Sequence, residues 1–210
     1  MEVVYSNSSY KDSDKYILGY YGDIINLNKE IDVDGIDYDD EWSVKRFLNG
    51  YSFKIDNNIY ELFKELNIDT CYLKYKIKYL PRTIFKYILL IYVIINNKHL
   101  IILDNIEVGL TYKEKKNIIN LIRKLKEDNR EIVVVSHDLY FLDKICEIID
   151  VINGSKSVYY GTMDDLIKLD NYVEEPEIIS FIKMANKKNA NLSYTLDSKE
   201  LLKDIYRSVC

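Results

Sequence analysis

The sequence predicts an α/β fold in which a mostly parallel sheet is flanked by helices. Short apolar runs of strand length occupy residues 99–104, 131–136 and 148–152. Amphipathic segments with helical periodicity, 111–127 and 138–148, alternate with these runs. Strand, helix and strand in this order fold as parallel strands joined by right-handed crossovers. We expect one main α/β domain over residues 1–170 and a C-terminal helical extension over residues 171–210.

Individual signals support the elements of this predicted sheet. Residues 84–95 are apolar on almost every side, which predicts a buried helix before the first of the three strands. Thr111 and Glu114 form a capping-box pattern at the start of the next helix, and Asp138 can cap the helix after it. Residues 155–161, which follow Gly154, should pair antiparallel with the strand at 148–152.

The segments outside this alternation also carry signals. Asp34 and Gly35 between alternating apolar residues indicate a hairpin at 29–38. Residues 56–68 predict a short helix, within a shortened helical subdomain over about 56–95. Two helices are expected after residue 170, and Asp197 with Glu200 forms a capping pair for the second.

Composition excludes several classes of protein. Hydrophobic residues make up 48% and charged residues 30% of the 210 residues, as in a soluble globular protein. The apolar run at 87–95 is too short to span a bilayer, and the amino terminus lacks the apolar core of a signal peptide, so we expect a cytoplasmic protein. The net charge of −5 argues against nucleic-acid binding. Three cysteines without paired spacing predict free thiols.

Two polar residues at the ends of neighbouring strands form the candidate site. Asp104 ends the strand predicted at 99–104, and His137 follows the one at 131–136. Carboxyl ends of parallel strands share one edge of the sheet, where ligands bind. A carboxylate at this edge can hold Mg²⁺ beside phosphates. The alternatives are that Asp104 caps a turn and that His137 is a hydrogen-bonded structural residue.

Residues 80–162 resemble the second half of an ATP-binding-cassette (ABC) ATPase subunit. The motif IILDN at 101–105 is similar to the Walker B strand, VGLT at 108–111 to the D-loop, and residues 133–162 to the H-loop segment. The resemblance implies a P-loop NTPase-like ABC ATPase core that binds ATP with Mg²⁺. It also implies that Asp104 holds the metal ion and that His137 contacts the γ-phosphate and the attacking water.

The C-terminal segments PEIISFIKMANKKN and TLDSKELLKDI are similar to the tail of energy-coupling-factor (ECF) ATPases, the cassette subunits of vitamin and metal-ion importers. This resemblance implies two partners. One is an intact ABC ATPase subunit in a heterodimer, and the other is a membrane transporter subunit that would hold the chain at the inner face of the cell membrane. The alternative is that these segments are two generic amphipathic helices.

Several residues depart from the family's pattern at positions that serve catalysis. Asn105 stands at the position of the catalytic glutamate, and a neutral amide can orient water but cannot accept its proton near neutral pH. The signature motif falls at residues 80–84, where Pro81 lacks an amide and Ile84 lacks a polar side chain.

The phosphate loop is expected before a first helix that ends at residues 17–19. This placement puts Lys11 near the phosphate-binding lysine and Ser13 near the Ser/Thr position that follows it. No glycine precedes Gly19, however, and a loop that wraps phosphates needs the positive φ values of glycine. A solvent-exposed surface lysine is therefore the alternative for Lys11.

These observations leave three hypotheses for the function. The first is a degenerate ABC ATPase-like protein that hydrolyses ATP weakly or not at all. The second is a working ATPase of a membrane transporter, with Lys11 on the phosphates, Asp104 on Mg²⁺ and His137 at the water. The third is an α/β scaffold that binds another protein without catalysis.

Overall fold

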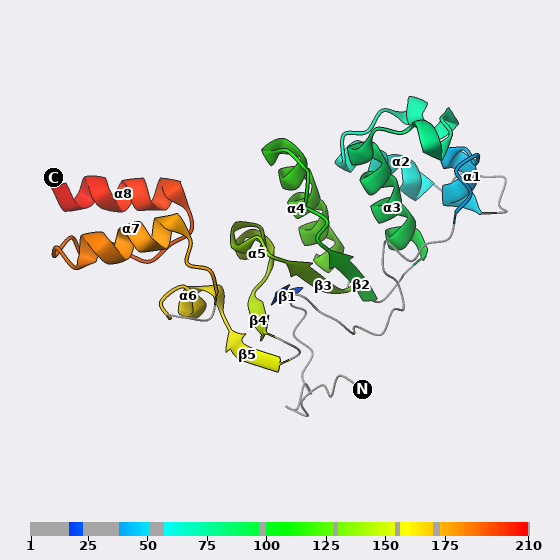
Figure 1. The fold of residues 1–210 in the computed structure, drawn as a ribbon. Helices are drawn as coiled ribbons and strands as arrows, with labels where there is room; N and C mark the ends of the chain where they lie inside the picture. The colour runs from blue at the N-terminus through cyan, green and yellow to red at the C-terminus, as the bar shows by residue number, and fades with distance from the viewer. Residues whose placement is uncertain are drawn as a thin grey trace.

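The computed structural model describes residues 17–22, 38–50, 57–96, 100–127, 130–153, 156–169 and 173–209. At its centre is a five-stranded sheet in the order β2-β3-β1-β4-β5 (Figure 1). The strands are β1 (Ile17–Tyr21), β2 (Leu100–Asp104), β3 (Glu131–Ser136), β4 (Ile148–Asn153) and β5 (Lys156–Gly161). Neighbouring strands are parallel except β4 and β5, which are antiparallel. The predicted mostly parallel sheet and its antiparallel last strand are confirmed.

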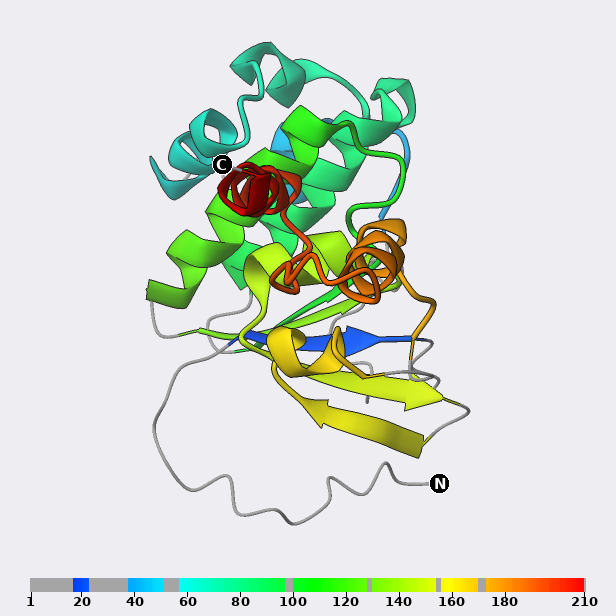
Figure 2. The ribbon, with the colours of Figure 1, turned by 90° about the vertical axis from the view of Figure 1, so that its left-hand side faces the viewer.

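Three groups of helices accompany the sheet. The helices α4 (Tyr112–Glu127) and α5 (Leu139–Ile145) pack against its strands. A helical group lies at one end of the molecule and the tail helices at the other (Figure 1), so the tail helices face the viewer in Figure 2. The helical group is α1 (Val44–Asn49), α2 (Asn57–Glu65), α3 (Arg82–Asn96) and the 3₁₀ turns η2 (Thr70–Lys74) and η3 (Ile77–Tyr79). The remaining helices are α6 (Met163–Leu166), α7 (Glu177–Asn186) and α8 (Ser198–Val209).

The core forms where the apolar faces of these elements meet. Helix α3 is apolar on most sides and buries seven side chains, as predicted for residues 84–95. Fully burying an aliphatic side chain stabilises the fold by about 1.5–3 kcal/mol. The face of α4 toward the core is Ile118, Leu121, Ile122 and Leu125.

Among the described residues, no helix is both long enough and apolar enough to cross a membrane.

Strand β1 corrects one expectation from the sequence. Residues 17–19 do not end a helix, because Ile17–Tyr21 is a strand that pairs with β3 on one side and β4 on the other. The aliphatic and aromatic side chains of this stretch suit a strand, and Gly22 ends it with a φ of 116°. Of the hairpin expected at residues 29–38, the structure describes only Tyr38, and Gly154 lies outside the described residues.

The two C-terminal helices occur where the sequence predicts them. Asp197 caps α8, since its Oδ1 accepts a hydrogen bond from the backbone N–H of Lys199 at 2.9 Å. Glu200 instead accepts from the side chain of Lys203 at 2.7 Å. The side chain of Lys144 in α5 donates to Asp197 at 3.1 Å, which ties the tail to the main α/β domain.

The capping box at the start of α4 is confirmed. The backbone N–H of Thr111 donates to Oε2 of Glu114 at 2.7 Å, and the backbone N–H of Glu114 donates to Oγ1 of Thr111 at 3.4 Å.

Replacing Thr111 with alanine should cost about 1 kcal/mol of unfolding free energy, measured by urea denaturation. Thr111→Ser keeps the hydroxyl and should retain most of that stability. Equal destabilisation by both substitutions would contradict this role of the hydroxyl.

Candidate functional site at the carboxyl edge of the sheet

The carboxyl ends of β1, β2 and β3 lie side by side because these strands are parallel neighbours. Asp104 is in register with Val135, and Tyr21 is in register with Ser136. Asp104 is the exposed last residue of β2, and His137 is the exposed residue that follows β3. The structure therefore brings Asp104 and His137 to one edge of the sheet, on neighbouring strands.

Asn105 is held against Asp104. Its side-chain amide donates a hydrogen bond to Oδ1 of Asp104 at 2.7 Å, and its backbone N–H donates to the carbonyl of Val135 at 2.9 Å. Its φ of 45° lies in the left-handed region, which asparagine tolerates better than most residues. The amide thus engages a carboxylate oxygen that a metal ion would need. Asn105 itself carries no carboxylate that could accept a proton from water.

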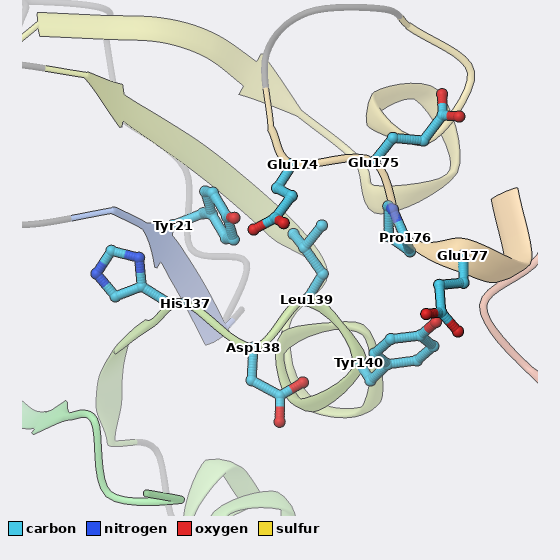
Figure 3. Close-up of a pocket in the computed structure, with 9 residues that line it drawn as sticks. All are labelled: Tyr21, His137, Asp138, Leu139, Tyr140, Glu174, Glu175, Pro176 and Glu177. Carbon is cyan, nitrogen blue, oxygen red and sulfur yellow. The ribbon is translucent and has the colours of Figure 1, made fainter. Parts of the chain in front are cut away.

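An open pocket of about 420 Å³ lies beside His137 (Figure 3). The imidazole of His137 packs edge-on against the ring of Tyr21, with ring centroids 5.8 Å apart. Glu174 turns its carboxylate toward Tyr21 from the segment before α7 (Figure 3). Burial raises the pKa of Tyr21, a hydrogen bond with the backbone of Glu174 acts against this rise, and the charge of Glu174 adds a smaller increase. The lining residues are Tyr21, His137, Asp138, Leu139, Tyr140, Glu174, Glu175, Pro176 and Glu177.

Carboxyl groups dominate the charge of this pocket. Asp138, Glu174, Glu175 and Glu177 contribute to the lining, and none of the described lining residues is lysine or arginine. The Asp138 carboxylate points away from Glu174 (Figure 3) and forms an ion pair with Lys115 at 2.6 Å. It also caps α5 as predicted. Glu175 is likewise paired with Lys183, so a polyphosphate placed here would meet Glu174 and Glu177 as like charges.

Glu107, in the loop between β2 and α4, is a buried carboxyl group that the sequence analysis missed. It is 2% exposed, and its Oε1 accepts a hydrogen bond from the hydroxyl of Ser136. Its Oε2 is buried without a hydrogen-bond partner in the part of the chain that the structure describes. Burial raises the pKa of Glu107. The side chain of Glu107 is therefore closed off from solvent.

The signature position lies at the amino terminus of α3. The carbonyl of Pro81 accepts from the backbone N–H of Phe85 at 2.9 Å, so Pro81 serves as the entry to the helix. Ile84 packs partly buried against the core. Lys86 donates to the carbonyl of Val108 at 2.5 Å, which ties this helix to the D-loop position of the same chain.

The placement of the phosphate loop needs revision. Lys11 and Ser13 lie outside the described residues, and their assignment rested on a helix at 17–19 that is a strand. A phosphate loop follows the carboxyl end of its strand, and the chain leaves β1 at Gly22. The pattern GxxxxGK[ST] counted from Gly22 ends on Leu27, Asn28 and Lys29. Neither the second glycine nor the lysine of that pattern is present there.

The described residues do not by themselves form a closed site for Mg²⁺. The described residues contain no group of three or more His, Cys, Asp or Glu side chains that could hold a metal ion. Asp104 supplies a single carboxylate, which already accepts from Asn105. Mg²⁺ is usually held by one or two carboxylates together with substrate phosphates, so the phosphate-binding groups decide whether it binds.

Comparisons with known proteins relate the chain to one family, although no family model matches it. A Pyrococcus abyssi protein named as an ABC transporter ATP-binding protein is 32% identical over 108 residues, which cover 50% of this chain and 40% of that protein. The energy-coupling factor transporter ATP-binding protein of Oenococcus oeni is 26% identical over 119 residues, 54% of this chain and 41% of that protein. The chain thus matches about two fifths of the length of these relatives.

A solved structure of an ATP-binding subunit of an ABC transporter shares the fold. It superposes with a TM-score of 0.57 at 14% sequence identity, over 73% of this chain and 81% of that one. In sequence and in fold, the chain is therefore related to the ATP-binding proteins of ABC transporters, an ECF transporter ATPase among them.

Proposed function

We propose that this chain is a non-hydrolysing or weakly active relative of the ATP-binding subunits of ABC and ECF transporters. The observation that carries the proposal is the pair formed by Asp104 and Asn105, in which an amide engages the carboxylate at the metal position. An amide at this place can orient a water molecule but cannot remove its proton.

Two further features support the proposal. The pocket beside His137 is lined by carboxyl groups, which disfavour a polyphosphate. The segment after β1 has Leu27 and Asn28 where the phosphate-loop pattern, counted from Gly22, needs glycine and lysine. Together these features remove both the charge that attracts phosphates and the group that would activate water.

We further propose that the chain acts beside an intact ATP-binding subunit, in a heterodimer that works with a membrane transporter subunit at the inner face of the cell membrane. The ECF transporter ATPase among the relatives supports this assignment. In such an assembly the intact subunit would supply the ATP-hydrolysing residues, and this chain would contribute its fold and surfaces.

Phosphate release from Mg-ATP by the purified chain tests the proposal. We expect turnover far below the roughly 1 per second that marks the low end of typical enzymes, and no further loss in Asp104→Ala. Asn105→Glu should also stay inactive. If the missing base were the sole defect, this substitution would restore about 10²- to 10⁴-fold.

Titration calorimetry with Mg-ATP separates loss of binding from loss of chemistry. We expect no heat of binding in the wild type, and none in Asn105→Glu. Turnover of about 1 per second or more that disappears in Asp104→Ala would show an active enzyme and overturn the proposal.

A further inference from the structure

We infer that the buried carboxyl group of Glu107 positions His137, and that it acts through the hydroxyl of Ser136. Glu107 lies in the loop between β2 and α4, and Ser136 is the last residue of β3, directly before His137. The side chains of Glu107 and Ser136 are 2% and 0% exposed and meet although 29 positions separate them in sequence. This role depends on neither the binding nor the hydrolysis of nucleotide, so it goes beyond the proposed function.

The hydroxyl of Ser136 makes two hydrogen bonds that enclose His137. It donates to Oε1 of Glu107, and it accepts from the backbone N–H of Asp138 at 2.9 Å. A hydroxyl has a single proton, so donation to Glu107 leaves its lone pairs available to the amide of Asp138. One side chain thus ties together the residues on both sides of His137, and Glu107 sets the direction of its hydroxyl.

The carboxylate of Asp138, in the same turn, serves other groups. Its Oδ1 accepts from the backbone N–H of Phe141 at 3.0 Å, and its Oδ2 accepts from the ammonium of Lys115 at 2.6 Å. Asp138 therefore fixes the start of α5, and it leaves the Ser136 hydroxyl to Glu107.

The loop that carries Glu107 is itself anchored. The ammonium of Lys86 in α3 donates to the carbonyl of Ile106 at 3.4 Å and to that of Val108 at 2.5 Å, on either side of Glu107. The carbonyl of Glu107 accepts from the backbone N–H of Leu110 at 3.1 Å. Because its backbone is held in this way, Glu107 offers the Ser136 hydroxyl a fixed acceptor.

The imidazole of His137 rests on the turn that these bonds hold. It packs edge-on against Tyr21, with ring centroids 5.8 Å apart, and Tyr21 is in register with Ser136 on the neighbouring strand. Figure 3 shows His137 and Asp138 leaving the turn in different directions. The backbone of the turn sets the direction of each Cα–Cβ bond, so loss of the Ser136 hydrogen bonds should move the imidazole relative to Tyr21.

Stability alone does not account for a carboxyl group at this position. Oε2 of Glu107 is buried and has no hydrogen-bond partner among the residues that the structure places. A buried polar atom without a partner lowers stability, and an apolar side chain of similar size would avoid this loss. The bond from Ser136 to the other oxygen is the interaction that an apolar side chain could not make.

Two-dimensional NMR of the histidine ring protons in the full chain tests this role. The chain has 2 histidines, and the spectrum of His137→Gln identifies the signal of His137. Glu107→Leu removes the acceptor, so we expect the His137 signal to leave its wild-type position and its cross-peak with the Tyr21 ring to be lost. Glu107→Gln keeps a carbonyl oxygen for the Ser136 hydroxyl, and both features should be retained.

Two further variants separate positioning from a general loss of stability. Ser136→Ala removes the same hydrogen bonds, so its His137 signal should match that of Glu107→Leu, and combining the two substitutions should cause no further shift. Glu114→Leu removes a different carboxyl group, at the capping box of α4. It should lower the urea midpoint and leave the His137 signal in place.

A wild-type His137 signal in Glu107→Leu, or additive shifts in the double variant, would overturn the inference. An equal shift in Glu107→Gln and Glu107→Leu would also overturn it, because loss of the charge alone would then account for the change. If Glu107→Leu does not fold, a wild-type signal in Ser136→Ala, or a displaced one in Glu107→Gln, has the same consequence.

Discussion

Replacing Glu107 with glutamine is expected to abolish a pH dependence of stability that the buried carboxyl group imposes on the fold. Glu107 is 2% exposed, accepts from Ser136 at one oxygen and leaves the other oxygen buried without a described partner. Burial raises its pKa above the ordinary value of 4.5, and the charge of Asp138 adds to the rise, while Ser136 and Lys115 act against it. A buried polar group without a partner costs about 1–3 kcal/mol, and a charged one costs more.

The sign of the effect follows from the raised pKa. Below pH 4.5 the Glu107 carboxyl group is protonated in both the folded and the unfolded chain. In that range its titration does not change the free energy of unfolding. As the pH increases above 4.5, the unfolded chain releases its proton first, and the free energy of unfolding falls until the pH passes the folded-state pKa. Each unit of pKa difference corresponds to about 1.4 kcal/mol.

Urea denaturation of the wild type and of Glu107→Gln at about pH 5 and about pH 8 measures this effect. The free energy of unfolding of the wild type should fall relative to the variant as the pH rises. Changes at titrating groups distant from Glu107 are common to both proteins and cancel in the difference. A wild-type-minus-variant difference that stays constant between the two pH values would show that Glu107 titrates normally.

Glu114 supplies a control of opposite sign. Its pKa is lowered, first by the backbone N–H of Thr111 and then by the side chain of Thr111. The carboxylate of Glu114 therefore stabilises the fold above the unfolded-state pKa of 4.5, and this stability is lost as the pH falls through the lowered value. The free energy of unfolding of the wild type minus that of Glu114→Gln should thus grow as the pH rises through this acid range.

The alternation of helix and strand after residue 84 could be predicted because each element carries its own local signal. A few consecutive residues are enough to recognise the apolar run of β3, the capping box of α4 and the helix cap at Asp138. Strand β1 carried a comparable signal, a five-residue apolar and aromatic run bounded by Gly22, but its neighbours in the sheet are more than 100 residues away in sequence. Without local partners, this run does not by itself exclude the helix end that the family resemblance implies at residues 17–19.

The candidate site likewise has features that local sequence signals predict and features that they do not. Asp104, Asn105 and His137 follow predicted strands, so parallel topology alone brings them to one edge. The carboxyl-lined pocket requires residues 174–177 to return to the end of β1, and no local pattern predicts that return. The burial of Glu107 likewise depends on its contact with Ser136 of another strand. Such contacts arise from packing between distant segments, which periodicity does not report.

A methyl group added at Gly19 is expected to destabilise the fold by about 1–3 kcal/mol, because β1 passes very close to α5 there. A Cβ at this position would lie 2.8 Å from Sγ of Cys146 and 3.3 Å from Cδ2 of Leu142. Gly19→Ala should lower the urea midpoint, and Gly19→Val should lower it further. Gly50→Ala is the control, since a Cβ there meets no atom within 4 Å and its cost arises from its φ of 55°.

A double-mutant cycle with Cys146→Ala distinguishes overpacking from a change in backbone conformation. Removing the sulfur eliminates the closest contact and leaves the Cβ of Cys146 at 3.0 Å from the new methyl group, so part of the loss from Gly19→Ala should be recovered. Residues in contact typically couple by about 0.5–3 kcal/mol, whereas Gly50→Ala and Cys146→Ala should be additive. Additive effects of Gly19→Ala and Cys146→Ala would contradict this packing of β1 against α5. Coupling at Gly19 alone would show in solution that β1 packs against Cys146, as the structure has it.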